Sequence, residues 1–195
     1  SFQTVKMDVW DYDIGSQPSL IDDHGTPALL IASKQGDLYI LDRATGKPLA
    51  PIGTIQAPLG GAEASLRSPS QIESLWNTLR KPPLKESDMW GMSPIDQMIC
   101  RIQFHQADYR GFYTPPSVDK FSVQYPGYNG GSDWGSLSID PVRGIAIANY
   151  NDMPNYVKLV TRAEANKAGI VPRFATNTPP SKPHQIDPQW GAPYA

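Results

Sequence analysis

A cluster of carboxylates lies near the start of the chain, where residues 8–13 read DVWDYD. At the end of a strand, Asp11 and Asp13 would share one face, because alternate strand residues point the same way. Like charges and a bulky aromatic neighbour raise the pKa of a carboxyl group, as a general base requires. A solvated acidic turn is the competing interpretation. A calcium loop is disfavoured, because its central Gly and terminal Glu are absent.

Two strand–turn–strand units would position such side chains. The first contains an apolar run over residues 27–33, a second apolar stretch at 37–41 and a turn at 42–47. In that turn Asp42 can bond its own backbone and Gly46 can take a positive φ, which predicts a tight hairpin. Residues 137–149 repeat the pattern around an acidic turn at 140–144. Repeated units of this kind build the blades of β-propellers.

Between the two units lies a long irregular insert, over residues 51–125. A capping sequence at 68–71 (SPSQ) predicts a helix. Its inward face would contain Ile72, Leu75, Trp76 and Leu79. A second start at 93–96 (SPID) predicts a helix with Ile95, Met98 and Ile99 inward. A third short helix should follow residues 161–164 and end at Gly169, where a positive φ can close it.

Composition excludes several classes of protein. The 195 residues carry a net charge of -2 and lack the basic stripe of a nucleic-acid-binding protein. With 20 Pro and 16 Gly, the chain favours a turn-rich β fold. The best apolar run, residues 28–32, suits one buried strand and is far too short to cross a bilayer. Cys100 is the single cysteine, so no internal disulfide forms, and its apolar context predicts a buried, inert thiol.

Several short motifs, taken in their order along the chain, resemble those of a known family, which the composition alone does not indicate. They are DVWDYD at 8–13, QPSL at 17–20, SKQG at 33–36, LDRATG at 41–46, DMWG at 88–91, DQMICR at 96–101, YTPPS at 113–117 and DWG at 133–135. This series resembles the membrane-bound dehydrogenases that use pyrroloquinoline quinone (PQQ), in the glucose, quinate and shikimate branch. The resemblance implies part of an eight-bladed quinoprotein β-propeller, mainly β, with a long irregular insert carrying short helices. It also implies PQQ and a divalent metal, calcium or magnesium, on the propeller axis.

The resemblance assigns four residues to the site. Asp11 matches the family's catalytic base, and Lys34 matches the basic residue that contacts the quinone oxygens. Asp133 and Trp134 match a polar–Trp pair near the cofactor, although relatives often have Asn or Glu at the first position. A solvated Lys34 and a packing role for Trp134 remain the structural alternatives. No residue is assigned to the metal, whose ligands would mostly lie outside this chain.

The same resemblance predicts organisation and activity. Residues 1–50 would be blade strands with the Asp and Lys motifs, 51–125 the insert, 126–170 further blade strands and 171–195 an extended tail. The intact enzyme would oxidise a cyclic polyol or aldose, with quinate or shikimate first and glucose second, and pass electrons to ubiquinone. Its partners would be the remaining blades of the same enzyme, with self-association through exposed blade faces and no nucleic acid. We expect a periplasmic protein, attached to the inner membrane by segments outside this chain.

The sequence departs from the pattern of this branch at two places. Lys6 and Met7 stand where the branch commonly has a His before the carboxylate motif, and Lys6 would favour a carboxylate substrate by Coulomb attraction. Gly135 is followed by Ser136 where many members have a second Gly.

The alternatives to an enzyme are a non-enzymatic β-propeller scaffold or carbohydrate-binding module, and an inactive truncated remnant. Convergence of Asp11, Lys34 and Trp134 on one axis would favour the enzyme.

Overall fold

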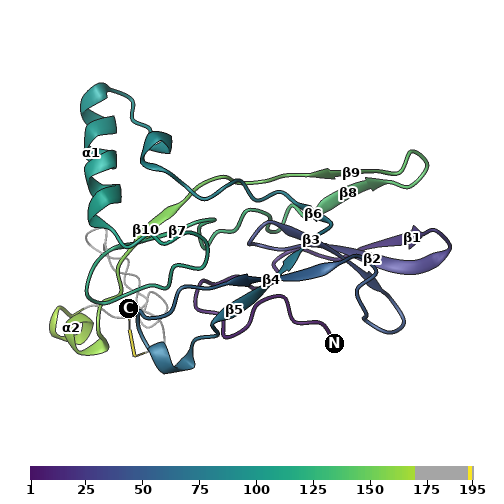
Figure 1. The fold of residues 1–195 in the computed structure, drawn as a ribbon, viewed down its shortest axis with the longest axis horizontal. Helices are drawn as coiled ribbons and strands as arrows, with labels where there is room; N and C mark the ends of the chain where they lie inside the picture. Colours follow the sequence, from purple (N-terminus) through teal and green to yellow (C-terminus); the bar gives the residue numbers. More distant parts are fainter. Residues whose placement is uncertain (170–192, 195) are drawn as a thin grey trace.

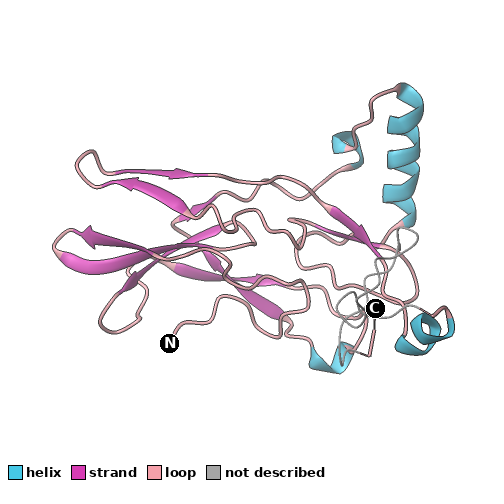
Figure 2. Ribbon diagram, turned by 180° about the vertical axis from the view of Figure 1, so that it is seen from behind, coloured by secondary structure: helices cyan, strands magenta, loops and turns pink. Residues whose placement is uncertain are grey.

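Strands outweigh helices in the computed structural model, which describes residues 1–169 and 193–194. Within these residues, one four-stranded sheet has the order β1-β2-β3-β6, and three two-stranded sheets pair β4 with β5, β7 with β10, and β8 with β9 (Figure 1). Helix is confined to short segments at one end of the molecule (Figure 2). The expected mainly β structure with short helices is confirmed.

The first predicted unit forms the four-stranded sheet. Its strands are β1 (Ser19–Asp23), β2 (Thr26–Ala32), β3 (Asp37–Asp42) and the short β6 (Asn77–Thr78). The apolar run becomes β2, in which Ala28, Leu30 and Ala32 alternate toward a core that also includes Leu38 and Ile40 of β3. Because both strands are apolar on this face, the register of the antiparallel pair is fixed by burial.

Both predicted turns form as expected. After β3, Asp42 Oδ1 accepts hydrogen bonds from the backbone of Ala44 and Thr45, and Gly46 has a φ of 72°. In the second unit, β8 (Leu137–Asp140) and β9 (Ile145–Ala148) pair across a turn whose Gly144 has a φ of 66°. The Asp42 carboxylate and the two turn glycines therefore have the roles in the turns that were predicted from the sequence.

The helix predicted from residue 68 is wrong. Residues Ser70–Ser74 form strand β5, paired antiparallel with β4 (Ile52–Gln56). Pairing with a strand some eighteen residues earlier is a tertiary effect that a local capping sequence does not report. The amide of Gln71 serves the backbone of Lys6 instead of a helix end: it accepts from Lys6 N and donates to Lys6 O, both at 2.7 Å.

The other two predicted helices are confirmed. Helix α1 (Pro94–Gln106) begins at Ser93, whose hydroxyl accepts from Asp96 N, and α2 (Arg162–Lys167) begins at Thr161. The predicted inward face of α1 is wrong, because none of its residues is buried. Ile95, Met98 and Ile99 are 66%, 54% and 44% exposed. The helix projects from one end of the molecule beside the 3-10 turn η2 (Glu86–Asp88), away from the sheets (Figure 1).

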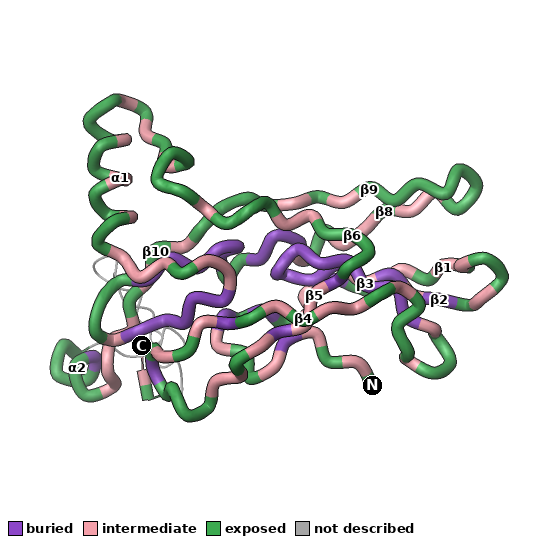
Figure 3. Tube along the Cα trace, in the orientation of Figure 1, coloured by how far each residue is buried: buried purple, intermediate pink, exposed green. Residues whose placement is uncertain are grey.

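The insert is bound closely to the start of the chain. A second core joins Val5, Trp10 and Tyr12 to Ala57 and Tyr113 of the insert. Strand β7 (Ser122–Gln124) then pairs with β10 (Asn155–Val157) beyond the insert. Buried backbone runs through the middle of the molecule, whereas α1 and the tip of the β8–β9 hairpin are exposed (Figure 3).

Two further expectations concern the C-terminal tail and membrane-spanning segments. The predicted extended tail, residues 171–195, lies outside the described residues except for 193 and 194. Among the described helices, none has the length and apolar character needed to cross a bilayer.

Candidate active site

Lys34 occupies the tight turn that joins β2 to β3. Gly36 N donates to Ser33 O at 2.9 Å, and Ser33 N donates to Asp37 O at 3.0 Å. The Ser33 hydroxyl bonds the backbone of Asp37 as well, so the turn is closed by side chain and backbone together. Lys34 is therefore presented by a rigid turn between two buried strands, as active-site side chains require.

Asp11 lies in a loop and not on the strand end that the sequence suggested. Its φ of 61° is left-handed, an uncommon conformation for a residue other than glycine. Asp8 explains the shape of this loop, because its carboxylate accepts hydrogen bonds from Trp10 N at 2.9 Å and Tyr12 N at 2.8 Å. Desolvation of the carboxyl group raises the pKa of Asp8 despite these hydrogen bonds, with a smaller contribution from the charges of Asp11 and Asp13.

The aromatic residues on either side of Asp11 anchor the loop. The Trp10 ring nitrogen donates to Thr114 O at 2.9 Å, and Gln124 donates to Trp10 O at 2.6 Å. The Tyr12 hydroxyl donates to Pro126 O, and both rings are 2% exposed. Burial therefore alternates along residues 10–12: the two aromatic side chains are buried, and the carboxylate of Asp11 between them lies at the surface, where it can contact a ligand.

Asp11, Asp13 and Lys34 meet at this surface. Lys34 Nζ lies 2.6 Å from Asp13 Oδ1 and 3.3 Å from Asp11 Oδ2. The lysine side chain is 8% exposed, whereas those of Asp11 and Asp13 are 70% and 64% exposed. Burial of the ammonium lowers the pKa of Lys34, but its hydrogen bonds to Asp13 and Asp11 outweigh that effect and the pKa is raised. The structure thus places the carboxylate of Asp11 and the ammonium of Lys34 in contact.

The loop that carries Asp133 packs against the same turn. Gly131 N donates to Lys34 O at 2.7 Å, and a Cβ on Gly130 would lie 2.5 Å from Lys34 Cγ. The carboxylate of Asp133 lies against Gly15, where an added Cβ would meet it at 1.8 Å. Trp134 differs, because the residue is 87% exposed. The structure therefore brings Asp11 and Lys34 into contact and places Asp133 beside the same segment, while Trp134 extends into solvent.

Sequence reasoning named two further carboxylates without giving them a role. Asp13 is the nearer partner of Lys34, and Asp8 shapes the loop that holds Asp11. The spacing of the three carboxylates in DVWDYD is the local signal for both residues. Arg80, discussed below, had no comparable local signal.

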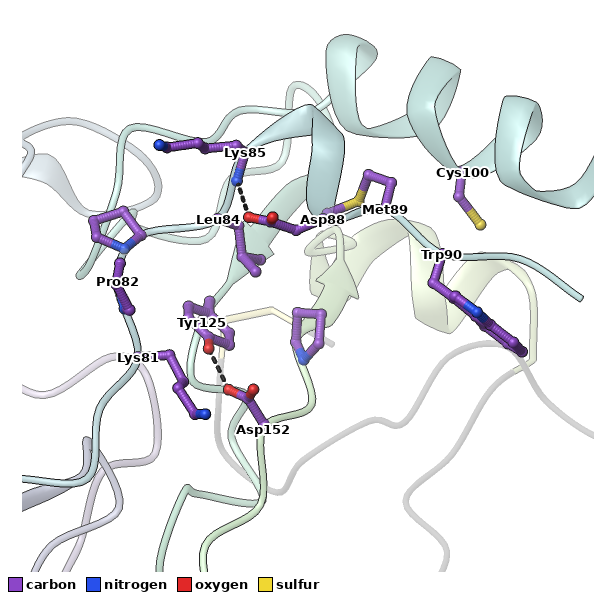
Figure 4. A pocket seen from close by; sticks show the side chains of 12 residues that line it. Lys81, Pro82, Leu84, Lys85, Asp88, Met89, Trp90, Cys100, Tyr125 and Asp152 are labelled. Atoms are coloured by element: carbon purple, nitrogen blue, oxygen red, sulfur yellow. Dashed lines mark hydrogen bonds between the residues drawn. The ribbon is translucent and has the colours of Figure 1, made fainter. Parts of the chain in front are cut away.

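A hollow of about 790 Å³ lies between residues 81–90 and Cys100 of α1 on one side and Tyr125 and Asp152 on the other (Figure 4). Lys81, Trp90 and Cys100 line it, as do Tyr125 and Asp152, and the Tyr125 hydroxyl donates a hydrogen bond to Asp152. Cys100 is half-buried, so the prediction of a buried thiol is wrong. The reason is that α1, which carries Cys100, stands clear of the sheets and has no buried residue.

Comparison with known families decides the wider relationship. The family model for the β-propeller domain of PQQ-dependent glucose, ethanol and alcohol dehydrogenases matches residues 1–195. The chain belongs to this family. It is 54% identical to the glycerol dehydrogenase large subunit of Gluconobacter oxydans (strain 621H), over 88% of this chain and 24% of that protein.

Other relatives extend the range of substrates in their names. A quinoprotein glucose dehydrogenase of the same organism is 43% identical over 85% of this chain and 21% of its own length. A probable quinate dehydrogenase (quinone) of Xanthomonas campestris pv. juglandis is 39% identical over 100% of this chain and 25% of its own length. The chain thus spans about a quarter of the curated relatives it matches. No solved structure matches it significantly.

The residues around Lys34 fit the PQQ of this family. An ammonium has three protons, and Asp11 and Asp13 accept two of them, which leaves one for a quinone oxygen. Asp133 Oδ1 and Ser132 Oγ, on the adjoining loop, are buried and have no hydrogen-bond partner among the described residues. Within residues 1–169 and 193–194, no group of three or more His, Cys, Asp or Glu side chains is arranged to hold a metal ion.

Proposed function

We propose that this chain supplies the proton-accepting and quinone-contacting residues of a PQQ-dependent dehydrogenase that oxidises a hydroxyl group of a polyol or sugar. Family membership supports the reaction class. The observation that carries the assignment is the contact of Asp11 with Lys34, two groups that the chemistry needs within reach of one cofactor. PQQ, when bound, supplies the electrophilic quinone that accepts hydride.

Asp11 acts as the base in this proposal. Its exposed carboxylate takes the proton of the substrate hydroxyl while the adjoining carbon loses hydride. The left-handed backbone and the Asp8 hydrogen bonds hold Asp11 in place before substrate arrives, which removes part of the entropic cost of the reaction.

Lys34 contacts the quinone oxygens. Its remaining proton donates a hydrogen bond there, and its charge stabilises negative charge as it develops on these oxygens. Asp133 and Trp134 line the cofactor's surroundings, and Trp134 is available to pack on a ring because its own chain leaves it uncovered. A calcium or magnesium ion would be held mostly by residues outside this chain.

The substrate is a cyclic polyol or aldose, with quinate or shikimate first and glucose second, and ubiquinone accepts the electrons. An acyclic polyol is the alternative substrate class, favoured by the 54% identity to glycerol dehydrogenase large subunits. We place the protein in the periplasm, at the inner membrane. The remaining propeller blades are its principal partners.

Two substitutions in the complete polypeptide test this proposal. Asp11→Asn should remove turnover and leave PQQ affinity unchanged, whereas Lys34→Met should weaken PQQ binding about tenfold or more, because it removes a desolvated cation. Asp119→Asn, at an exposed carboxylate of the insert, is the matched control and should change neither quantity. Unchanged PQQ affinity in Lys34→Met would favour the scaffold or remnant alternatives.

A further inference from the structure

A buried arginine of the insert, Arg80, lies next to the turn that presents Lys34. Strand β6 pairs with the beginning of β3, and the chain then continues along the turn. Leu79 N donates to Gly36 O at 2.7 Å, and the Thr78 hydroxyl donates to the same oxygen at 3.2 Å. A Cβ on Gly36 would lie 3.0 Å from Arg80 N, so insert and turn are in direct backbone contact.

The guanidinium of Arg80 joins three parts of the molecule. Its Nη2 lies 3.2 Å from Glu73 Oε2 on β5, and its Nη1 lies 3.8 Å from Asp37 Oδ2 on β3. The Phe112 ring stacks under it, with 4.4 Å between the guanidinium carbon and the ring centroid. Such a planar, delocalised cation can meet two carboxylates and a ring together, which an ammonium cannot do.

This cluster is withdrawn from water. The Arg80 side chain is 7% exposed and that of Asp37 0%. Burial raises the pKa of Asp37, and the charge of Arg80 opposes that rise. The carboxylate of Asp37 also accepts from the Tyr39 hydroxyl at 3.3 Å. Removing one partner of a buried ion pair leaves the other charge uncompensated, so we expect the loss of Arg80 to displace Asp37. Asp37 is also the residue that closes the Lys34 turn onto Ser33.

The far side of the turn is held by a second contact. The Tyr150 ring lies between Gly36 and Gly131, since an added Cβ on either would meet its Cε2, at 3.1 Å and 2.1 Å. Gly131 in turn donates to Lys34 O. The Lys34 turn is therefore clamped between the insert, through Arg80, and the loop that carries Asp133.

We propose that Arg80 is a positioning residue for Lys34: its buried contacts with Asp37, Glu73 and Phe112 fix the turn from which Lys34 reaches the quinone. This inference deepens the proposed function and rests on it. It gives the insert a direct part in cofactor binding, although Arg80 itself touches neither PQQ nor substrate. Because Arg80 acts through Lys34, its effect on PQQ affinity should vanish when Lys34 is absent.

A double-mutant cycle on PQQ affinity tests this dependence. Lys34→Met, Arg80→Met and the double variant are made in the complete polypeptide, and each is titrated with PQQ by fluorescence in the absence of substrate. We expect Arg80→Met to weaken PQQ binding about tenfold on the normal background and by less than about twofold on the Lys34→Met background, the non-additivity expected of coupled residues. Thermal unfolding is followed in parallel.

Two variants separate positioning from stability. Arg67→Met removes another arginine of the same insert, one that donates to Ala62 O, and should leave PQQ affinity unchanged at whatever cost in thermal midpoint. Arg80→Lys keeps the charge but loses the planar fork, so its PQQ affinity should fall between those of the normal protein and Arg80→Met. If Arg80→Met does not fold, the cycle is completed with Arg80→Lys.

The outcomes are distinct. Equal losses from Arg80→Met on both backgrounds would overturn the inference, because Arg80 would then act independently of Lys34. So would an affinity that Arg80→Met leaves unchanged. Normal affinity in Lys34→Met would instead defeat the proposed role of Lys34, and the inference with it.

Discussion

Lys34 Nζ lies nearer to Asp13 Oδ1, at 2.6 Å, than to Asp11 Oδ2, at 3.3 Å. The ammonium is therefore held mainly by Asp13, a carboxylate to which the proposed mechanism gives no proton transfer. Asp11 is left with the weaker contact and an exposed side chain, the arrangement a base needs when substrate must approach it.

This geometry predicts a pH effect for Asp13→Asn. The hydrogen bonds to Asp13 and Asp11 raise the pKa of Lys34 against the opposing effect of burial, so losing Asp13 should lower that pKa. A lysine whose pKa is raised stabilises the fold fully below its ordinary pKa and loses this contribution as pH rises through the folded-state value. In the normal protein the alkaline fall in PQQ affinity should therefore lie above about pH 10.5, the ordinary pKa of lysine, and in Asp13→Asn it should move to lower pH. An alkaline limb that stays in place would contradict the role given to Asp13.

The Asp8 hydrogen bonds predict a structural effect on Asp11. Asp8→Ala leaves Trp10 N and Tyr12 N without their acceptor and should lower the free energy of unfolding by about 1 kcal/mol, as for the loss of a capping carboxylate. It should also reduce kcat, because Asp11 loses its fixed backbone. Asp8→Asn keeps one acceptor oxygen and should show a smaller loss of both. Chemical denaturation and steady-state kinetics check these values, and equal losses in the two variants would be the contrary result.

Gly130 predicts a steric effect on Lys34. Alanine there would place a Cβ 2.5 Å from Lys34 Cγ, on a backbone with a φ of 79°, and should destabilise the protein by about 2 kcal/mol while weakening PQQ binding. Gly25→Ala is the matched control: its φ is 86°, but no atom of the described residues lies within 4 Å of the added methyl group. It should cost about 1 kcal/mol of backbone strain and leave PQQ affinity unchanged. Similar effects of the two substitutions on affinity would remove the proposed contact.

The exposed apolar residues predict association of the isolated 195-residue chain. Leu20 of β1 is 64% exposed, and Ile145 and Ile147 of β9 are 48% and 67% exposed. Blade faces of this kind are covered by neighbouring blades in a propeller, so the isolated chain should self-associate in sedimentation velocity experiments. Lysine at both Ile145 and Ile147 should reduce this association. A monomer at high concentration without these substitutions would contradict the prediction.

The sequence predicted local features well and tertiary ones poorly. The apolar run that becomes β2, the Asp42 turn and the capped start of α1 are all local features of the sequence, and all were predicted correctly. Strand β5 was missed because its partner, β4, is distant in the chain and outweighs a good helix-capping sequence.

The site shows the same division. Family resemblance placed Asp11 and Lys34 together, and the structure has them in contact. Nothing local distinguishes Arg80 from a solvated arginine, because its burial depends on Glu73, Asp37 and Phe112 converging from separate segments. One local signal does point to a buried cation: Asp37 is the first residue of an apolar strand, and a carboxylate buried there needs a positively charged partner.

The central claim, that Asp11 is the base of a PQQ-dependent dehydrogenase, is tested most directly by turnover of Asp11→Asn in the complete polypeptide loaded with PQQ and calcium. Quinate, shikimate, glucose and glycerol are each supplied with a quinone acceptor, and PQQ occupancy is measured on the same samples. We predict that kcat on the preferred substrate falls by about a thousandfold or more, the scale of a lost general base, while PQQ occupancy equals that of the normal protein. Retained turnover at full PQQ occupancy would contradict the claim.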